Sequence, residues 1–417
     1  MVSSEENRLI TETGPGTPGG DLFRRYWQPV GLSEELESGA PVAVEILGEK
    51  LVLFRNDEGQ LGLLGLHCSH RGADLSMGRI EDGGLRCLYH GWLYDVHGRC
   101  VEQPAELEGS GFKDKIRHKA YPCQEAAGVV FAYLGPGQAP NLPMYEPLSV
   151  PESQRYAYKV LHECNWLQAH EGEIDPTHLS FLHRRLHQPS WRQRAIKGSP
   201  GVQANTFFAK DASPRLEVET TPFGVRIATL RKADDSHSYL RVSNGILPNI
   251  STISSGIGGD GYDINWHVPI NNERHWKYVI TFRRMPLEAL DWKNITERSK
   301  EITSDYKLVR NPRNKYLQDR ESMKTGNFSG LGLINLVQDA AMVQGQGAIQ
   351  DRTQEHLGSG DKAIIAFRRA FLTMLERIRG GDEATRESSE SVSDVFVVSE
   401  LISAEDNWPE YCKKFTK

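Results

Sequence analysis

The chain has 417 residues, 38% hydrophobic and 25% charged, a composition typical of globular proteins with a sizeable core. Its formal net charge of −6 argues against the basic surface with which proteins bind nucleic acid. No apolar run approaches the roughly 20 residues that span a bilayer, and the acidic N-terminus MVSSEENRLITE has no feature of a secretory signal or transit peptide. We therefore expect a cytoplasmic protein that binds neither nucleic acid nor a membrane.

The N-terminal third of the chain predicts a small β domain. After a Gly/Pro-rich loop and an aromatic-rich segment, short apolar runs such as LVLFRN, LGLLGL and GVVFAYLG alternate with the turn sequences NDEG and EDGG. The stretch GPGQAPNLP predicts a linker after them. We expect an antiparallel β domain over residues 41–140. We also expect the N-terminal segment 1–40 to pack on the larger domain formed by residues 141–417.

Residues 141–417 predict a larger domain that mixes helices and strands. Strand patterns occupy 216–250 and 262–284, and helical patterns occupy 163–186, 297–309, 332–345 and 360–379. The polar stretch GGDEATRESSESVSD predicts a mobile segment near the C-terminus. The expected fold class is α+β, with an antiparallel sheet flanked by helices in this second domain.

Two cysteine–histidine pairs lie at turns of the predicted β domain. They are Cys68-Ser-His70 and, sixteen residues further on, Cys87-Leu-Tyr-His90. Mixed zinc sites usually pair two cysteines in one turn and two histidines in another, whereas each turn here supplies one of each. This order favours a [2Fe–2S] cluster with two thiolates on one iron and two imidazoles on the other, which raises the potential to roughly −150 to +300 mV. Zinc, or no metal, is the alternative.

The run HCSHRGADLSMGRIEDGGLRCLYHGWLYD resembles the cluster segment of the Rieske non-heme iron oxygenases. The resemblance extends from FRRYWQPV to IQDRTQEHLGSGDKAIIAFRR, and CNWLQAHEGEIDPTHLSFLHR is similar to the iron segment of the phthalate dioxygenase branch. It implies the α subunit (terminal oxygenase component) of an aromatic-ring-hydroxylating system, with a mononuclear Fe(II) in addition to the cluster. His170 departs from the apolar residue that the resemblance leads us to expect.

The motif Asp175-x-x-His178-x-x-x-x-His183 is ambiguous by itself. Histidines five residues apart do not stack on an ideal helix, so one core and one surface histidine would be the ordinary interpretation. Binding one ion would need a distorted helix or a helix end, and Pro176 makes a helix start there plausible. Two histidines and one carboxylate leave iron positions open for O₂, and the cluster needs an electron acceptor. The resemblance implies His178 and His183 as ligands, with catalytic roles for Asn165 and Asp175.

The third iron ligand must lie far along the chain, where Asp339, Asp351, Glu355 and Asp361 are candidates. Asp339 occurs in the apolar helical pattern INLVQDAAMVQGQG, where a buried carboxylate is costly unless it binds a cation or is otherwise paired. The resemblance also points to the aspartate of QDAAMVQGQ. We therefore favour Asp339.

The resemblance gives Asp175 a separate role. It implies that Asp175 contacts His178 and, across an interface, the cluster ligand His90 of a neighbouring copy, so that the two metals are coupled. This predicts a homo-oligomer, a trimer or a hexamer. An N-cap for the following helix is a compatible role for the same aspartate.

The resemblance also implies partners and substrate. Electrons would pass from NAD(P)H through a separate flavin/iron–sulfur reductase to the cluster and then to the iron, where O₂ and an aromatic substrate react. For an aromatic carboxylate a pocket arginine is expected; Arg241 is our first choice, ahead of Arg226, Arg215 and Lys210, although a solvent-exposed position is favoured for each. Ring dihydroxylation of a phthalate- or benzoate-type substrate ranks ahead of O-demethylation of a methoxy-aromatic acid. A Rieske electron-transfer protein without oxygenase activity is a remoter alternative.

Overall fold

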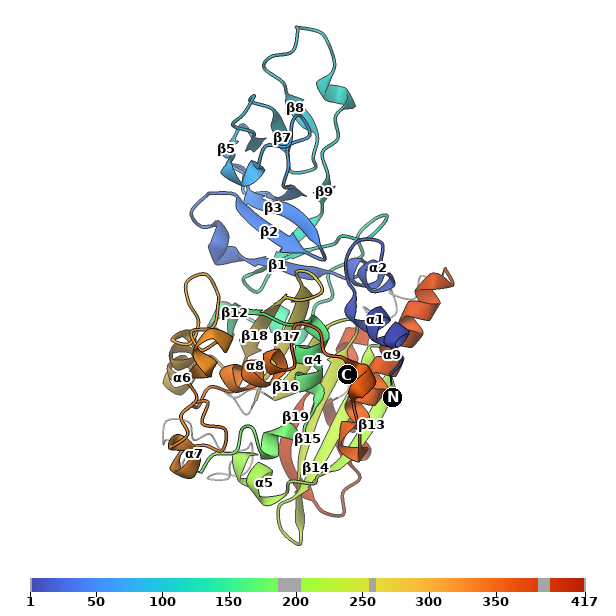
Figure 1. Cartoon of the computed structure of the whole chain (residues 1–417), viewed down its shortest axis with the longest axis vertical. Helices are drawn as coiled ribbons and strands as arrows, with labels where there is room; N and C mark the ends of the chain where they lie inside the picture. Colours follow the sequence, from blue (N-terminus) through green and yellow to red (C-terminus); the bar gives the residue numbers. More distant parts are fainter. Residues whose placement is uncertain (1, 187–203, 255–259, 382–390, 416–417) are drawn as a thin grey trace. The chain divides into compact units, whose positions relative to one another are not determined.

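The computed structural model describes residues 2–186, 204–254, 260–381 and 391–415 and is shown in Figure 1. The chain divides into two compact units, the smaller formed by residues 13–142 and the larger by 1–12 together with 143–417. In the ranges just given, no helix combines the length and the apolar character that crossing a membrane requires.

The smaller unit is built from short antiparallel strands. Its described strands form three sheets: β1 (Gln28–Leu32), β11 (Val129–Ala132) and β10 (Cys123–Ala126); β2 (Val42–Ile46), β3 (Glu49–Arg55), β4 (Leu61–Gly65) and β9 (Ala120–Tyr121); and β5 (Arg79–Glu81), β6 (Gly84–Arg86), β7 (Leu93–Asp95) and β8 (Cys100–Glu102). Val52, Phe54 and Leu64 from the second sheet share one core cluster with Leu85 and Tyr94 from the third. This confirms the predicted small antiparallel β domain.

The N-terminal boundary differs from the predicted one. Only residues 1–12, which hold α1 (Ser4–Thr11), join the larger unit, where α1 packs on the helices α4 and α9 described below. Helix α2 (Pro18–Arg24) and β1 belong to the smaller unit, because β1 is buried and pairs with β11 about a hundred residues later. The smaller unit therefore begins at residue 13, whereas the sequence placed the start of the β domain at residue 41.

The larger unit is organised around one antiparallel sheet. Among the described residues its strand order is β12 (Arg155–His162), β18 (His275–Phe282), β17 (Tyr262–Pro269), β16 (Ile250–Ser254), β15 (His237–Ile246), β14 (Gly224–Lys232) and β13 (Arg215–Thr221), with β19 (Val398–Ser403) also pairing with β15. The central strands are buried over most of their length, so both faces of the sheet must be covered.

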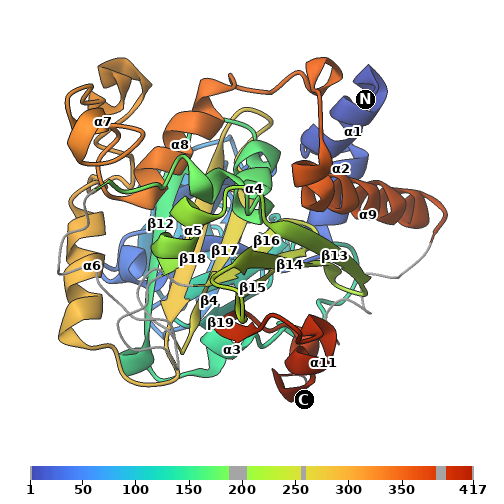
Figure 2. The ribbon, with the colours of Figure 1, turned by 90° about the horizontal axis from the view of Figure 1, so that it is seen from below.

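Helices cover one face of this sheet, as Figure 2 shows for α4 (Trp166–Ile174), α8 (Asn335–Gly345) and α9 (Lys362–Arg379). Helix α9 packs on β13 and β14, while α4 packs on β16, β17 and α8. On the other face, Phe396, Val398 and Trp408 pack against Ala228 and Val242. Other helical segments of the larger unit include α3 (Glu146–Ser149), the 3₁₀ turn η5 (His178–Ser180), α5 (Ala204–Lys210), α6 (Ala289–Ser299), α7 (Ser322–Thr325) and α11 (Trp408–Cys412).

This sheet flanked by helices confirms the predicted α+β class. Helices α8 and α9 fall within the predicted ranges 332–345 and 360–379, whereas α6 ends at the start of the range predicted over 297–309. Most of the C-terminal stretch predicted to be mobile, residues 382–390, lies outside the described residues.

A buried ion cluster connects α4 to α9. Glu171 accepts from Arg352 Nη2 at 2.9 Å and from Arg368 Nε at 2.5 Å, and Arg368 also pairs with Glu355. Removing Glu171 would leave the fully buried guanidinium of Arg352 without a carboxylate partner, at a cost of about 3–5 kcal/mol, so the cluster holds α4 in place. The residues that follow α4 are those in which the sequence predicts iron ligands.

Candidate metal centres

The two cysteine–histidine turns of the smaller unit share one backbone arrangement. The amide of Gly72 donates to the carbonyl oxygen of Cys68 at 2.8 Å, and the amide of Gly91 donates to that of Cys87 at 3.0 Å. Both glycines have positive φ, 73° and 75° respectively, which residues with a Cβ rarely adopt. Glycine at the end of C-S-H-R-G and C-L-Y-H-G therefore allows each turn to close on its cysteine.

These turns place sulfur and imidazole at different depths. Cys68 and Cys87 are buried, and burial, assisted by the neighbouring Cys68, raises the pKa of Cys87. The rings of His70 and His90 lie nearer the surface with centroids 4.5 Å apart, and Trp92 stacks on His70. Thiols inside and imidazoles outside form a donor set that fits a [2Fe–2S] cluster with two cysteines on one iron and two histidines on the other.

Tyr94 lies beside one of these sulfurs, with its Oη 3.2 Å from Cys68 Sγ. A hydroxyl donating to a cluster sulfur stabilises the more negative, reduced cluster. Losing one hydrogen bond costs about 1 kcal/mol, which corresponds to about 40 mV for a one-electron couple. We expect Tyr94→Phe to lower the cluster midpoint potential by this amount in an EPR-monitored redox titration. Tyr121→Phe, whose hydroxyl bonds to Glu49 instead, is the control, and an unchanged potential in Tyr94→Phe would contradict the assignment.

In the larger unit the second predicted site begins where α4 ends. Asp175 has φ −86° and ψ 109°, because a following proline disfavours helical dihedrals in the residue before it. After Pro176 only the single turn η5 forms. The prediction of one helix over 163–186, and of Pro176 as a helix start, was therefore wrong. This break lets His178 and His183 face each other although they are five residues apart.

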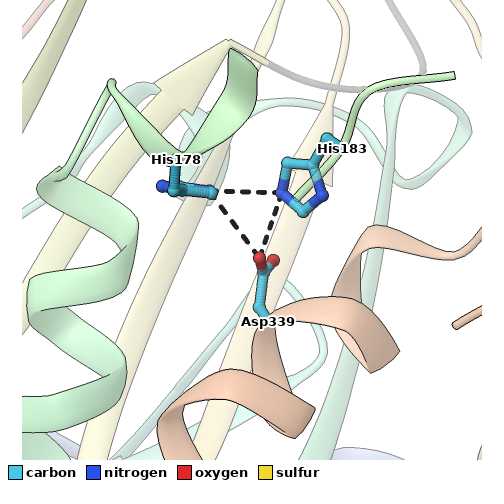
Figure 3. A group of neighbouring side chains, drawn as sticks. All are labelled: His178, His183 and Asp339. Carbon is cyan, nitrogen blue, oxygen red and sulfur yellow. Dashed lines mark hydrogen bonds and ion pairs between the residues drawn. The ribbon is translucent and has the colours of Figure 1, made fainter. Parts of the chain in front are cut away.

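The side chains of His178, His183 and Asp339 converge, as Figure 3 shows. The two Nε2 atoms lie 3.2 Å apart, and Asp339 Oδ1 lies 3.0 Å from His183 Nε2 and 3.7 Å from His178 Nε2. One donor atom from each residue fits within 4.8 Å, a spacing at which the three could hold one metal ion. Two histidines and one carboxylate form the ligand set of mononuclear iron oxygenases, so the donors fit the predicted Fe(II).

The carboxylates of Asp339 and Asp175 attract a cation to this group, whereas the positive charges of Lys277 and Arg241 oppose it. Burial alone would raise the pKa of Asp339, but His183, His178 and Lys277 outweigh it, and the pKa is lowered. Burial would likewise lower the pKa of His178, yet Asp175 and Asp339 together raise it. Proton and metal compete for the same imidazole nitrogens, so the field that stabilises a proton here also stabilises a metal ion.

Each histidine has a different partner for its outer nitrogen. Asp175 Oδ2 lies 3.6 Å from His178 Nδ1, while Asp175 Oδ1 accepts from the amide and the hydroxyl of Thr177 at 2.7 and 2.6 Å. Thr177, and not Asp175, is the N-cap of η5. His183 Nδ1 lies 2.6 Å from Gln338 Oε1. The sequence interpretation missed Gln338, although a buried polar residue beside Asp339 in an apolar helix could have drawn attention to it.

The other candidate carboxylates have different partners. Asp351 is exposed and accepts from the amide and hydroxyl of Thr353, Glu355 pairs with Arg368, and Asp361 accepts from the amide of Gly358. Asp339 is therefore the candidate that the fold brings to the histidines.

Asn165 has a structural position. Its Oδ1 accepts from the amide of Leu167 at the start of α4, and its Nδ2 donates to the carbonyl oxygens of Thr11 and Asn272 at 3.0 and 2.7 Å. The side chain is fully buried and is absent from the wall of the cavity beside the histidines. These hydrogen bonds make Asn165 an N-cap that also anchors two neighbouring segments, and none of them reaches His178, His183 or Asp339.

Two further predicted residues are buried. His170 contacts Phe367, at 4.3 Å between ring centroids, and burial lowers its pKa to about 3, so it stays neutral. Arg241 is only 9% exposed, contrary to the solvent-exposed position favoured from the sequence, and its Nε donates to Ser254 Oγ at 2.9 Å. Arg241 and Gly245 are four residues apart on β15 and therefore lie on the same face of the sheet. Gly245 lies close to Ile174 of α4 on that face. The guanidinium of Arg241 thus extends from the helix-covered face and acts electrostatically on His178.

A cavity of about 440 Å³ adjoins the converging side chains. Met342, Leu182 and Phe181 contribute apolar surface near the predicted ligands His178 and Asp339, whose side chains form part of the wall. The buried ion pair of Lys277 and Glu173 also lies in the wall. A volume of this size accommodates a small aromatic molecule.

Family models match both units. Residues 26–121 match the Rieske [2Fe-2S] domain, and residues 132–417 match the LigXa C-terminal domain like family. Together these two matches cover the cysteine–histidine turns as well as the histidine–aspartate group.

Similar proteins of known name are oxygenase subunits. The chain is 33% identical to the phthalate 4,5-dioxygenase oxygenase subunit of Pseudomonas putida, over 100% of this chain and 96% of that one. It is 34% identical to the 5,5'-dehydrodivanillate O-demethylase oxygenase subunit of a Sphingobium species, over 92% and 82%, and 34% identical to the 3-chlorobenzoate-3,4-dioxygenase oxygenase subunit of Comamonas testosteroni, over 90% and 89%.

Solved structures share the fold. The terminal oxygenase of carbazole 1,9a-dioxygenase from Nocardioides aromaticivorans matches with a TM-score of 0.59 at 20% identity, over 90% of this chain and 97% of that one. With the family models and relatives, this shows that the chain is an oxidoreductase of the Rieske non-heme iron aromatic-ring-hydroxylating oxygenases, an α subunit of the phthalate dioxygenase-like branch that carries a [2Fe–2S] cluster and a mononuclear iron.

Proposed function

We propose that this chain is the terminal oxygenase of a multicomponent system that oxygenates an aromatic carboxylate. The convergence of His178, His183 and Asp339 beside a cavity carries this proposal. Iron(II) held by these three side chains would keep coordination positions free for O₂. The chain's own part is to hold the metal on three sides, to enclose the substrate, and to keep Asp339 ionised.

Electrons reach the iron through the cluster held by Cys68, His70, Cys87 and His90. A separate flavin/iron–sulfur reductase would supply these electrons from NAD(P)H, as the similarity to the oxygenase subunits of multicomponent systems implies. The outward position of the two imidazoles supports this role, because a carrier must approach the cluster edge closely.

The proposed substrate class rests on the named relatives and on one positively charged side chain, Arg241. Two of the relatives named above are dioxygenase subunits for phthalate and 3-chlorobenzoate, both aromatic acids. Arg241 presents a buried guanidinium on the helix-covered face, and among the described residues only its Nε makes a hydrogen bond. A planar guanidinium can bind a carboxylate through two hydrogen bonds. Arg241 is not among the residues that line the cavity of about 440 Å³, but its charge acts on His178, which does line it.

Substituting Arg241 by glutamine tests this role. A hydrogen bond to a charged group contributes about 1.5–3 kcal/mol, which corresponds to a rise in KM of about 10–100-fold. We expect that rise for a phthalate- or benzoate-type acid with little change in kcat. A neutral ester or amide of the same acid is the control, and its KM should change little. Equal effects on acid and neutral analogue would contradict the assignment.

O-demethylation of a methoxy-aromatic acid is a second candidate, because a relative at 34% identity is named an O-demethylase oxygenase subunit. The two reactions give different products. Ring dihydroxylation yields a cis-dihydrodiol, whereas attack on a methoxy carbon releases formaldehyde.

The experiment that tests the function is a substrate screen with the complete system. Purified chain with reductase, NAD(P)H and O₂ is supplied with phthalates, benzoates and methoxybenzoates, and diol and formaldehyde are both measured. We expect at least one of these acids to give a product that contains oxygen derived from O₂. An iron-loaded chain whose cluster accepts electrons but which oxygenates none of these would instead favour the electron-transfer alternative.

The assembly is proposed to be a trimer or a hexamer. In this arrangement Asp175 connects His178 with His90 of the partner subunit, so that electrons cross between copies. The two carboxylate oxygens of Asp175 have different neighbours, which supports this role. Oδ1 accepts from the amide of Thr177, and Oδ2 lies 3.6 Å from His178 Nδ1. Sedimentation of the purified protein tests the oligomeric state directly.

A further inference from the structure

Gln338 connects one predicted iron ligand to the backbone. Its Oε1 lies 2.6 Å from His183 Nδ1, and its Nε2 lies 2.6 Å from the carbonyl oxygen of Gly332. The side chain is 1% exposed, so water cannot replace either partner. Gln338 immediately precedes Asp339 on α8. One turn of this helix therefore supplies the predicted ligand Asp339 and also the side chain that contacts the predicted ligand His183.

The orientation of the Gln338 amide follows from its neighbours. The carbonyl oxygen of Gly332 only accepts hydrogen bonds, so the group 2.6 Å away from it must be the donating NH₂. The reversed amide would bring two carbonyl oxygens to that distance without a proton between them. The amide oxygen therefore faces His183, and it too can only accept.

The protonation of His183 follows in turn. A ring nitrogen 2.6 Å from an accepting oxygen must carry the hydrogen, so Nδ1 is the donor in this pair. In the neutral imidazole the lone pair is then on Nε2, which is the atom facing Asp339 and His178. We propose that Gln338 is a positioning residue that fixes the tautomer and ring orientation of His183 for metal binding.

The two histidines consequently differ in their outer partners. The charged carboxylate of Asp175 lies 3.6 Å from His178 Nδ1, beyond hydrogen-bond distance, whereas His183 Nδ1 lies 2.6 Å from the neutral amide oxygen of Gln338. A carboxylate makes an imidazole a more basic ligand than an amide does. Gln338 thus gives His183 a neutral hydrogen-bond acceptor, while the negative charge of Asp175 acts on His178 through space.

Two substitutions separate positioning from a merely structural role. Gln338→Leu removes the acceptor for His183 and the donor for Gly332. Gln338→Glu keeps an acceptor for His183 but loses the donor to Gly332, placing oxygen against oxygen there. If Gln338 only braced the backbone, glutamate would be at least as harmful as leucine; if it orients His183, glutamate retains metal binding.

The readout is metal affinity, measured without turnover. The full chain with its iron–sulfur cluster intact is depleted of mononuclear iron by chelation and titrated anaerobically with Fe²⁺, and with Co²⁺ whose visible bands report the ligand field. We expect Gln338→Leu to bind about 10–100-fold more weakly, and Gln338→Glu to bind at least as tightly as the unchanged chain with altered Co²⁺ bands.

Gln344→Glu is the matched control, because it adds the same charge to the same helix where Gln344 accepts from the amide of Glu163. Its affinity should be unchanged. Equal weakening in both Gln338 variants, or none in Gln338→Leu, would overturn the proposal. The inference rests on the mononuclear iron site and needs neither substrate nor reductase, so its failure is distinguishable from failure of the proposed function.

Discussion

Asp339→Ala is expected to abolish substrate oxidation while the visible spectrum of the iron–sulfur cluster stays unchanged. The variant removes the carboxylate that lies 3.0 Å from His183 Nε2 and leaves two neutral imidazoles to hold the metal. Loss of an outer partner alone costs about 10–100-fold in metal affinity, and loss of a direct ligand should exceed the upper end of that range. Mononuclear iron per chain and turnover with reductase should fall together.

Asp351→Ala is the control for this result. Asp351 was another candidate ligand from the sequence, but it is exposed and accepts only from Thr353. We expect iron content and turnover close to those of the unchanged chain. Retention of iron and turnover in Asp339→Ala would contradict the assignment of Asp339 as a ligand. A cluster that is still reduced normally in that variant would show that the mononuclear iron can be lost without loss of the cluster.

The parts of the site that could be predicted were those encoded locally. The order Cys-x-His and Cys-x-x-His, each followed closely by glycine, contains both the donors and the residue that lets each turn close. Helices α8 and α9 could be located because an apolar face recurs along them. For Asp339, burial cost in an apolar helix and the resemblance pointed to the same residue, and the structure brings it to both histidines.

What could not be predicted depended on contacts between distant segments. The pairing of β1 with β11 is invisible in either strand alone, so the domain boundary near residue 40 was misplaced. Arg241 could not be assigned to a face, because the cover over β15 comes from α4 and α9. Asn165 occurs in a motif that resembles an iron segment, yet its hydrogen bonds show that it caps and anchors.

Asp175→Asn is expected to slow electron delivery to the iron while both metals remain bound. Asparagine keeps an oxygen for Thr177 but removes the negative charge beside His178 Nδ1, 3.6 Å away in the unchanged chain. We expect reoxidation of the pre-reduced cluster, followed by stopped flow in a single turnover with substrate and O₂, to slow by about 10–100-fold. Metal analysis of the same preparation should show unchanged iron, which separates this effect from loss of a ligand.

Asp351→Asn controls for the local turn, because Asp351 accepts from the amide and hydroxyl of Thr353 just as Asp175 does from Thr177, but without a histidine beside it. Slowing in both variants would assign the effect to the turn. Mixed oligomers test the path between copies: chains with Cys87→Ser lack the cluster and chains with His183→Ala lack the iron, so neither is active alone. If electrons cross from one copy to the next, co-expression restores turnover. Asp175→Asn placed on the Cys87→Ser chain, which keeps the intact iron site, should slow the restored turnover by about 10–100-fold.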